Sequence, residues 1–251
     1  MITKIKKKIR SIINISFVFL TKITRTELSF IENNQPKKEN NFGLREYKRL
    51  AEKYKEYDEL KLHFGCGGRI LKEWINIDLF YGSFKKYLKY YSNNTYPEGE
   101  EERGTQKDFF AFNILKTGLP FENETVDVIF HEDFIEHLNQ KEQVLFLAET
   151  LRVLKYGSIH RINTPNLLTS MKNNSDFKNG LSGVFTDEWD KHIHKNILTP
   201  EYLKEIATMI GYSNVVFSNR DGSLSKKIPK EYRPTADSRS LDGNIFVDLI
   251  K

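Results

Sequence analysis

The sequence predicts an α/β fold built on a doubly wound, mostly parallel sheet. Two observations support this prediction. Short apolar runs alternate with stretches of helical periodicity, and a cluster of glycines follows directly after the first run, as at the ligand-binding edge of such sheets. Helices are expected at residues 44–57 and 199–210. The predicted strands lie at residues 61–64, 74–77, 109–112, 126–130, 159–163, 214–218 and 245–250.

The first two predicted strands carry the clearest binding signal. Gly65, Cys66 and Gly67 follow the first strand, and Asp78 ends the second. Glycine lets the backbone approach a ligand without a Cβ in the way. A carboxylate just past a strand end can accept hydrogen bonds from the hydroxyls of a ribose. The pattern therefore predicts a nucleoside site, with Asp78 as its first ligand contact.

The spacing within this segment argues against a dinucleotide. A dinucleotide fingerprint needs a third glycine for close helix packing and an acid about 20 residues further on. Here Ile70 occupies the third glycine position, and Asp78 comes only 78 − 65 = 13 residues after Gly65. We therefore do not expect NAD.

Later motifs arrive in an order that points to one family. The segments are residues 61–68 with 74–78, then 119–130, 134–138, 151–158, 161–166 and 198–212. Read together, over roughly residues 58–217, they resemble the class I S-adenosylmethionine-dependent methyltransferases, in particular the type 11-like branch that is often linked to surface-glycan biosynthesis. The resemblance implies a Rossmann-like sheet that closes with an antiparallel hairpin strand at the C-terminus.

The same resemblance implies S-adenosylmethionine as the methyl donor and a set of contacts to it. Asn113 stands where the family usually has an aspartate facing the adenine amino group, and its carbonyl oxygen can still accept that hydrogen bond. The implied cofactor-binding residues are His63, Gly65, Cys66, Gly67, Asp78, Asn113, Ile114 and His131.

Transfer of a methyl group to a hydroxyl also requires a base. The sulfonium methyl is already activated, so the protein mainly aligns donor and acceptor, but the hydroxyl proton needs a group within hydrogen-bond reach. Asp133 and His131, where the fourth strand ends, are the favoured candidates, and His137 is a third. Ligands gather at the carboxyl ends of parallel strands, beside the predicted donor site.

Three further residues are predicted to contact the substrate. Glu136 lies in the family-like segment, where orienting the loop is its alternative role. His192 and His194 are two residues apart and share one face if the chain is extended. Together with Asp133, Glu136 or His137 they could hold a divalent metal that polarises an acceptor diol, but no compact ligand motif enforces this. We therefore do not favour a bound metal ion, and we predict no metal ligands.

Two segments stand out by position. Residues 80–108 form an insertion whose aromatic residues have helical spacing, which favours helix packing over stacking on a sugar ring. Residues 173–190 could fold over the substrate as a lid.

The N-terminal region differs in character. Basic and apolar residues recur at three- and four-residue steps between residues 2 and 20, which predicts a basic amphipathic helix. Such a helix suits an anionic membrane surface, and packing against protein is the alternative. The apolar run is too short to span a bilayer. We expect an N-terminal segment at 1–31, a polar linker at 32–43 and one methyltransferase domain at 44–251.

Composition limits the remaining choices. Hydrophobic residues make up 39% of the 251, which excludes wholesale disorder. Cys66 is the single cysteine, so no internal disulfide can form and a reducing, cytoplasmic compartment is expected, with peripheral contact at the inner membrane surface. The small side chain of Cys66 explains its place in the glycine loop, so we do not expect it to act as a nucleophile. No basic stripe interleaved with aromatics predicts nucleic-acid binding.

These observations favour a methyltransferase that acts on a hydroxyl of a sugar or surface-glycan precursor. One alternative is a methyltransferase for a lipid or a quinone-like small molecule. Another is a non-catalytic relative that binds a partner, against which the intact set of Gly65, Gly67 and Asp78 argues.

Overall fold

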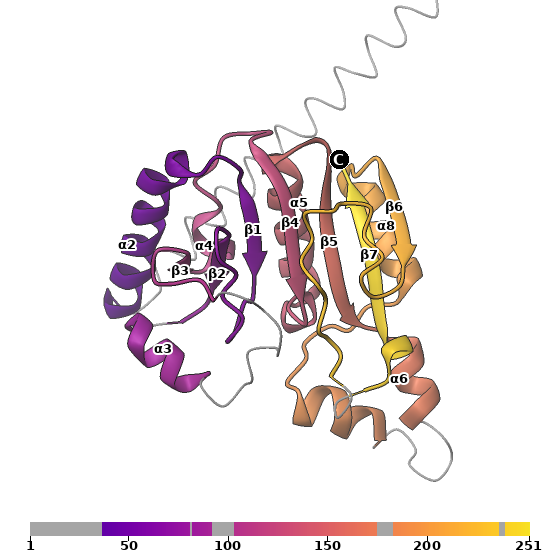
Figure 1. Cartoon of the computed structure of the whole chain (residues 1–251). Coiled ribbons are helices and arrows are strands. Elements are labelled where there is room, and N and C mark those ends of the chain that lie inside the picture. The colour runs from indigo at the N-terminus through magenta and orange to yellow at the C-terminus, as the bar shows by residue number, and fades with distance from the viewer. Residues whose placement is uncertain (1–36, 81, 92–102, 175–182, 236–238) are drawn as a thin grey trace, which may run out of the picture. The chain divides into compact units, whose positions relative to one another are not determined.

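In the computed structural model, residues 37–80, 82–91, 103–174, 183–235 and 239–251 are described (Figure 1). The chain divides into two compact units, Met1–Asn41 and Phe42–Lys251, and the description below concerns the second. The predicted amphipathic segment at residues 2–20 lies outside the described residues.

A seven-stranded sheet forms the centre of the second unit. The strands are β1 (Lys61–Phe64), β2 (Ile75–Asp78), β3 (Phe109–Ala111), β4 (Val126–Glu132), β5 (Leu154–Pro165), β6 (Asn214–Ser218) and β7 (Asn244–Ile250). Their order is β3-β2-β1-β4-β5-β7-β6, and β7 runs antiparallel to both of its neighbours. The predicted Rossmann-like fold, mostly parallel with an antiparallel C-terminal strand, is confirmed. A long connection, rather than a tight turn, joins β6 to β7.

Helices pack mainly behind this sheet and at its lower edge in Figure 1. They are α2 (Lys37–Lys53), α3 (Phe84–Tyr90), α4 (Ile114–Thr117), α5 (Gln140–Val153), α6 (Leu167–Asn174) and α8 (Pro200–Ile210), with a π-helix, η3, at Phe185–Lys191. Short 3-10 turns lie at Tyr54–Glu56, Ile135–His137 and Leu241–Gly243. Within the described residues, no helix is both long and apolar enough to cross a membrane.

The predicted start of the first helix needs correction. Helix α2 begins at Lys37 rather than residue 44, so it takes up part of the predicted linker. The linker was inferred from Pro36 and several asparagines, but asparagine is only a weak helix former and does not end a helix. Beyond Lys53 the chain tightens into a 3-10 turn.

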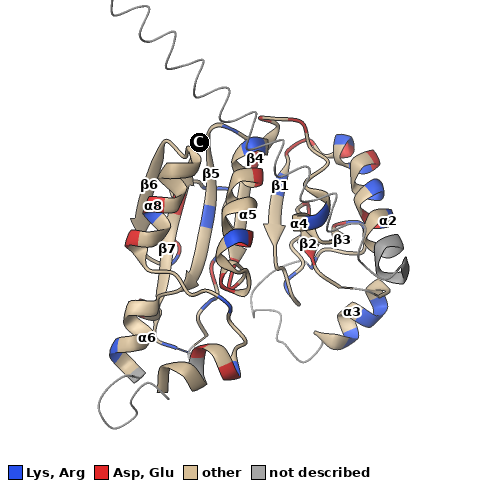
Figure 2. Cartoon of the chain, turned by 180° about the vertical axis from the view of Figure 1, so that it is seen from behind, with Lys and Arg blue, Asp and Glu red and all other residues tan. Residues whose placement is uncertain are grey.

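Local signals explain where α5 and α8 begin. Asn139 caps α5 in a reciprocal capping box with Glu142. Thr199 caps α8, whose first residue is Pro200. Both helices bury apolar residues against one face of the sheet, and this core contains Phe146, Leu147, Leu203, Ile129 and Ile162. Figure 2, which views the chain from behind, shows charged residues distributed over these helices.

The opposite face of the sheet is polar and is covered by irregular chain. Because side chains alternate along a strand, Arg161 and Asn163 point away from the face that carries Ile162. Arg161, fully buried, pairs with Glu231 at 2.7 Å and with Asp248 at 3.4 Å. These contacts attach the connection between β6 and β7 to the sheet.

A second buried ion pair lies nearby. The Arg69 guanidinium donates to Glu132 at 2.6 Å, and Glu132 also accepts from the backbone N–H groups of Tyr232 and Arg233. Leu71, Trp74 and Phe130 form a small apolar cluster on this side, with Ile228 packed against it. This polar layer was not predicted from the sequence.

Candidate functional site

The carboxyl ends of β1, β2, β4 and β5 meet at one edge of the sheet, the lower edge in Figure 1, where α3, α6 and η3 also lie. We call the part beside β1 and β2 the donor half, which comprises residues 65–67, 78 and 87. The acceptor half lies beside β4 and β5 and comprises residues 133–137, 188–194 and 244.

The glycine loop of the donor half needs glycine at two positions. Gly65 and Gly67 have φ angles of +58° and +51°, in the left-handed region. A Cβ on Gly65 would lie 2.6 Å from the ring of Phe134. The loop therefore packs directly against the segment that follows β4, which brings the two halves of the edge together.

Asp78 is the polar centre of the donor half. Its Oδ2 accepts hydrogen bonds from the Gly67 N–H at 2.9 Å and the Tyr87 hydroxyl at 2.7 Å, and its Oδ1 accepts from the Leu79 N–H at 2.6 Å. Burial raises the pKa of Asp78, and these hydrogen bonds counteract that shift. A carboxylate has about four acceptor positions. Asp78 therefore keeps capacity on Oδ1 for one ribose hydroxyl, while Tyr87 occupies the second position on Oδ2.

Tyr87 is the donor-half residue that sequence reasoning missed. The described aromatic residues of α3 pack against the domain, with Tyr87 buried in a cluster that includes Phe109 and Cys66. Its hydroxyl also lies 2.6 Å from the Gly67 carbonyl oxygen, so its single proton has two acceptors within reach. Helical spacing identified the packing of this stripe, but no sequence signal marks which tyrosine reaches the acid.

Cys66 behaves as its small size suggested. The thiol is buried, lies 3.3 Å from the Tyr87 hydroxyl, and has a pKa raised well above its usual range by burial. A thiol held neutral in this way is a poor nucleophile.

Three predicted donor contacts have other roles in the structure. His63 is buried, shares a 2.9 Å hydrogen bond with Asn76 and stacks on Phe130, so its ring faces the interior. The Asn113 side-chain oxygen caps α4 by accepting from the Leu115 N–H at 3.0 Å. Ile114, the first residue of α4, is buried. The family resemblance implied these contacts, but the direction of each side chain depends on the packing around it.

The two favoured candidates for the base, His131 and Asp133, lie in different environments. His131 is fully buried among the rings of Phe134, Phe146 and His160, and neither of its ring nitrogens makes a hydrogen bond. Burial lowers the pKa of His131 well below its usual range. The His131 ring therefore lies in the interior rather than at the exposed sheet edge, and its predicted roles as base and donor contact stay predictions.

Asp133 lies just after β4, at the edge of the sheet. Its φ angle of +47° is strained for a residue other than glycine, and its side chain is 30% exposed. Asn244 Nδ2 lies 3.4 Å from one carboxylate oxygen, and Arg233 Nε lies 3.7 Å from the other. Asp133 is thus held at the edge of the sheet with its carboxylate accessible.

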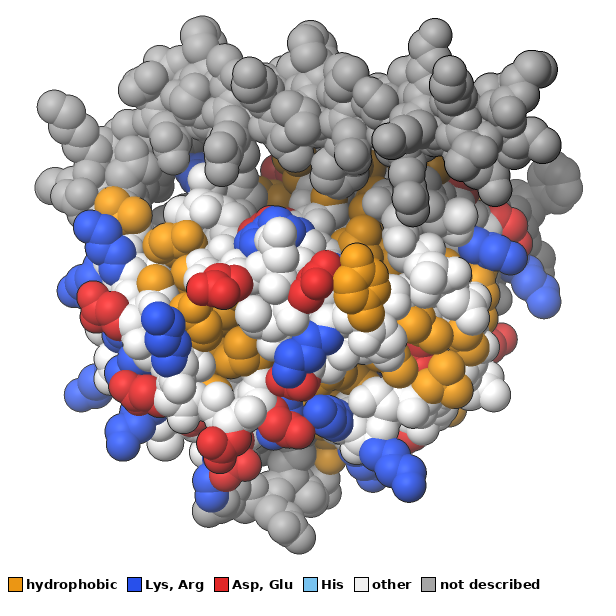
Figure 3. Space-filling view, turned by 90° about the horizontal axis from the view of Figure 1, so that it is seen from above, with side chains coloured by type: hydrophobic (Ala, Val, Ile, Leu, Met, Phe, Trp, Pro, Cys, Tyr) orange, Lys and Arg blue, Asp and Glu red, His pale blue; other side chains and the backbone are white. Residues whose placement is uncertain are grey.

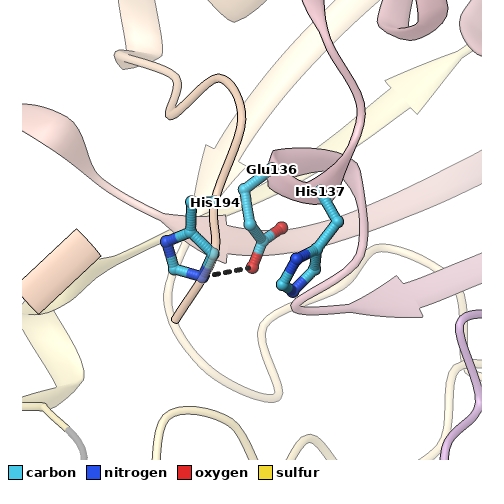
Figure 4. A group of neighbouring side chains, drawn as sticks. All are labelled: Glu136, His137 and His194. Carbon is cyan, nitrogen blue, oxygen red and sulfur yellow. Dashed lines mark ion pairs between the residues drawn. The ribbon is translucent and has the colours of Figure 1, made fainter. Parts of the chain in front are cut away.

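Glu136, His137 and His194 come together in one cluster (Figure 4). Glu136 and His137 lie in the 3-10 turn that follows β4, and His194 comes from the segment after η3. In Figure 4 the Glu136 carboxylate lies between the two imidazole rings. Its Oε2 accepts from Thr164 Oγ1 at 3.0 Å, whereas Oε1 makes no hydrogen bond. The predicted substrate residues Glu136 and His194 are therefore neighbours.

Backbone hydrogen bonds fix this cluster. The Glu136 carbonyl accepts from the N–H groups of Lys195 and Asn196, at 2.8 and 3.1 Å. Gln143 holds the same two segments, because its Nε2 donates to the carbonyls of Ile135 and Asn196. The segment that carries His194 is thus bound tightly to the turn that carries Glu136.

Glu188 supports His194 from the other side and was not predicted. It is fully buried and accepts from His194 Nδ1 at 2.9 Å and from Arg239 Nη2 at 3.0 Å. Burial alone would raise the pKa of Glu188, but hydrogen bonds from His194, Ser170 and Arg239 lower it to about 2. Glu188 lies in the segment 173–190 predicted to be a lid, of which residues 175–182 lie outside the described part of the chain, and the lid stays a prediction.

His192 lies next to this cluster. Its ring stacks on that of His194, with 5.5 Å between the centroids and 19° between the planes. The chain between them is not extended, because His192 has helical backbone angles and Ile193 has a φ of +57°, so the stacking does not follow from the predicted extended spacing.

A hollow of about 520 Å³ lies at the opposite edge of the sheet, near the start of β1, and is lined mostly by charged residues such as Lys53, Glu56 and Asp108. Figure 3 looks onto that edge, where acidic and basic side chains are interspersed. The strained Asp133 and the histidine cluster are at the other end of the strands, so we place the functional site there.

Comparisons with known proteins agree with the motifs. Residues 62–162 match a family described as "Methyltransferase domain". The matched stretch runs from β1 into β5 and contains the glycine loop, Asp78, Asp133 and Glu136. No curated protein matches the chain.

Several solved structures are similar. A SAM-dependent methyltransferase from Archaeoglobus fulgidus is 17% identical, with 82% of this chain and 92% of that chain covered and a TM-score of 0.48. One from Methanosarcina mazei is 14% identical, with 78% and 94% covered and a TM-score of 0.44. One from Thermotoga maritima, described as a possible histamine N-methyltransferase, is 13% identical, with 82% and 99% covered and a TM-score of 0.42.

Proposed function

We propose that the chain is a class I S-adenosylmethionine-dependent methyltransferase that methylates a hydroxyl group of a sugar or surface-glycan precursor. The match of residues 62–162 to a family described as "Methyltransferase domain" supports this proposal. The observation that carries this proposal is Asp133, an accessible carboxylate held in a strained conformation at the end of β4. A hydroxyl acceptor requires such a group, since its proton must leave as the new bond forms.

The donor half fits a nucleoside ligand. The positive φ angles of Gly65 and Gly67 expose the loop backbone, and Asp78 keeps an acceptor position on Oδ1. When bound, S-adenosylmethionine supplies an activated methyl group, whose bond to sulfur breaks with its electron pair left on sulfur while a bond to the acceptor oxygen forms. Asp133 accepts the proton released from that oxygen.

The polar character of the acceptor half supports a polyhydroxylated substrate. Asp133 and Arg233 offer an acceptor and donors within one small area, and His192 lies at the neighbouring segment. Groups of both kinds match the alternating donors and acceptors of sugar hydroxyls. The resemblance to a branch often linked to surface-glycan biosynthesis supports the same substrate class.

A lipid or quinone-like acceptor is the second candidate. Phe185 and Ile193 lie in and just after η3, beside the acceptor half, and are 60% and 73% exposed. Exposed apolar side chains at this position would suit an apolar substrate. A non-catalytic binding role is less well supported, because the intact donor half has no use in it.

Calorimetric titration of the purified protein tests the proposal first. We expect S-adenosylmethionine and S-adenosylhomocysteine to bind with micromolar affinity and NAD not to bind. Turnover of the donor is then measured with sugar nucleotides and glycans in one set and with lipids and quinols in another. No binding of either sulfur compound would overturn the proposed function, and turnover with the second set alone would replace the acceptor class.

A further inference from the structure

We infer that Glu136, His137 and His194 bind a divalent transition-metal ion, and that this ion holds two neighbouring hydroxyl oxygens of the acceptor. The second part rests on the proposed function and narrows its substrate to a vicinal diol. The first part stands on the geometry of the cluster alone.

The distances suit a metal ion. Each of the three residues offers one ligand atom, and these atoms all lie within 4.8 Å of one another. Glu136 Oε1 is 4.0 Å from His194 Nε2. Metal bonds to imidazole nitrogen and carboxylate oxygen are about 2.0–2.2 Å long, so two such ligands lie roughly 3–4 Å apart. Small side-chain rotations would therefore bring all three atoms into a common coordination sphere.

The hydrogen bonds around the cluster leave the ligand atoms free to coordinate. Thr164 engages Oε2 of Glu136, and Oε1, although buried, makes no hydrogen bond. Glu188 engages Nδ1 of His194, which leaves Nε2 as the ring nitrogen that faces Glu136. Two acceptor atoms thus face each other across 4.0 Å in a buried place. A cation bound between them would offset the free-energy cost of burying a polar atom that has no hydrogen-bond partner.

The support around His194 has the form that metal sites use. A ligating histidine almost always donates its other N–H to a carboxylate or a carbonyl, which fixes the ring orientation. Glu188 is that carboxylate, and Arg239 in turn holds Glu188. The backbone bonds from Lys195 and Asn196 to the Glu136 carbonyl keep the two ligand-bearing segments in register.

The donor set indicates which ions fit. Two imidazole nitrogens and one carboxylate oxygen favour Mn²⁺, Fe²⁺, Co²⁺ or Zn²⁺ over Mg²⁺ and Ca²⁺, which prefer oxygen ligands. Three protein ligands leave coordination positions for substrate oxygens. His137 is exposed, so the cluster opens to the sheet edge on its side.

An ion at this place would serve the reaction directly. A hydroxyl bound to a divalent cation loses its proton more readily, and Asp133 lies three residues before Glu136 to accept it. The second bound hydroxyl would fix the orientation of the acceptor. A cluster that is only an ion pair between Glu136 and a protonated His194 is the main alternative.

Metal binding is tested with Co²⁺, followed by visible absorption and calorimetry, on the full chain after treatment with a chelator. We expect one Co²⁺ ion per chain, with Mg²⁺ unable to displace it. Glu136→Gln and His194→Gln should each weaken Co²⁺ binding by more than about 100-fold, since loss of a group that merely orients a ligand costs about 10- to 100-fold. Absence of Co²⁺ binding, or unchanged binding in both variants, would overturn the site.

Two further variants keep the test decisive. His192→Gln alters the neighbouring stacked ring and should leave Co²⁺ affinity unchanged. Loss of Co²⁺ affinity in this variant would contradict the assigned ligands. Glu136 is fully buried, so Glu136→Gln could fail to fold. His137→Gln removes an exposed ligand instead and should, like the other two ligand variants, weaken Co²⁺ binding by more than about 100-fold. Circular dichroism checks that each variant is folded.

A second measurement separates this inference from the proposed function. All these variants should bind S-adenosylhomocysteine like the wild type, because the donor half is untouched. If the wild type does not bind S-adenosylhomocysteine, the proposed function is wrong, whereas the conclusion from Co²⁺ binding is unaffected. Turnover of a diol acceptor should require the metal, whereas metal-independent turnover equal for the diol and its singly deoxygenated analogue would overturn the diol assignment.

Discussion

The two halves of the sheet edge are assembled in different ways. The donor half takes its loop and its acid from one short stretch, Gly65 to Asp78, and adds Tyr87 from the next helix. The acceptor half draws Asp133 and Glu136, Glu188 and His194, and Asn244 from three distant parts of the chain. A contiguous motif can be found in sequence, whereas a site assembled from distant segments depends on the packing that brings them together. The predictions below perturb one half while the other serves as reference.

The largest effect is expected from Asp133→Asn. The amide cannot take a proton, so turnover with a hydroxyl acceptor should fall by about 10²- to 10⁴-fold, while binding of S-adenosylhomocysteine stays within twofold of the wild type. The matched control is Asp127→Asn, at the opposite end of β4, where the carboxylate pairs with Lys155 at the surface. Equal turnover in Asp133→Asn and the wild type would remove Asp133 as the base.

Asp78→Ala should affect the donor half alone. Loss of a charge-assisted hydrogen bond to ribose costs about 1.5–3 kcal/mol, which is about 10- to 100-fold in donor affinity. Calorimetry with S-adenosylhomocysteine measures it, with the exposed Asp58→Ala as control. Co²⁺ binding at the acceptor half should not change. A donor affinity equal to that of the wild type would show that Asp78 has a structural role only.

Buried histidines beneath both halves should make stability depend on pH. Burial lowers the pKa of His63 to about 3, and of His160 to about 3, against an ordinary value near 6.5. The unfolded chain then binds protons that the folded chain cannot. Stability is therefore fully present above pH 6.5 and falls as the pH drops toward 3, by about 1.4 kcal/mol per pH unit for each histidine.

Urea unfolding between pH 7.5 and pH 4.5 measures this slope. His63→Gln should reduce it by about 1.4 kcal/mol per pH unit below pH 6. Asn76→Ala removes the same hydrogen bond but keeps the imidazole, so it should lower stability at every pH and leave the slope unchanged. Identical slopes in the wild type and His63→Gln would mean that His63 becomes protonated in the folded protein.

The same contrast explains what sequence alone could predict. The seven strands and the glycine loop follow from apolar runs and local glycine chemistry, which act over a few residues. His131 and His63 satisfied the positional rule for a site residue, but the rings of Phe146 and Phe130 bury them. That outcome depends on which face of the strand each residue occupies, and a strand buried on both faces gives no periodic signal.

Glu188 and Arg161 illustrate the same limit for charged residues. In sequence, an isolated glutamate or arginine predicts a solvated surface position. In the fold, Glu188 holds His194 and Arg161 pairs with Glu231 across 70 positions. Only the arrangement of the strands brings these partners together. The pairing of His194 with Glu136 could be suspected from residue types, but the position of Glu188 could not.

The smallest effect is expected from Tyr87→Phe, which tests how strongly the Tyr87 hydroxyl orients Asp78. The change removes the hydroxyl that donates to Asp78 Oδ2 and lies near the Gly67 carbonyl. Unfolding free energy should fall by about 1 kcal/mol, and donor affinity by up to about fivefold, because Asp78 is then less firmly oriented before the ligand arrives. Tyr90→Phe, on the same helix but 73% exposed, should change neither. Tighter donor binding in Tyr87→Phe would instead show that the tyrosine competes with ribose for Asp78, and the donor half would then have to release this contact when the nucleoside binds.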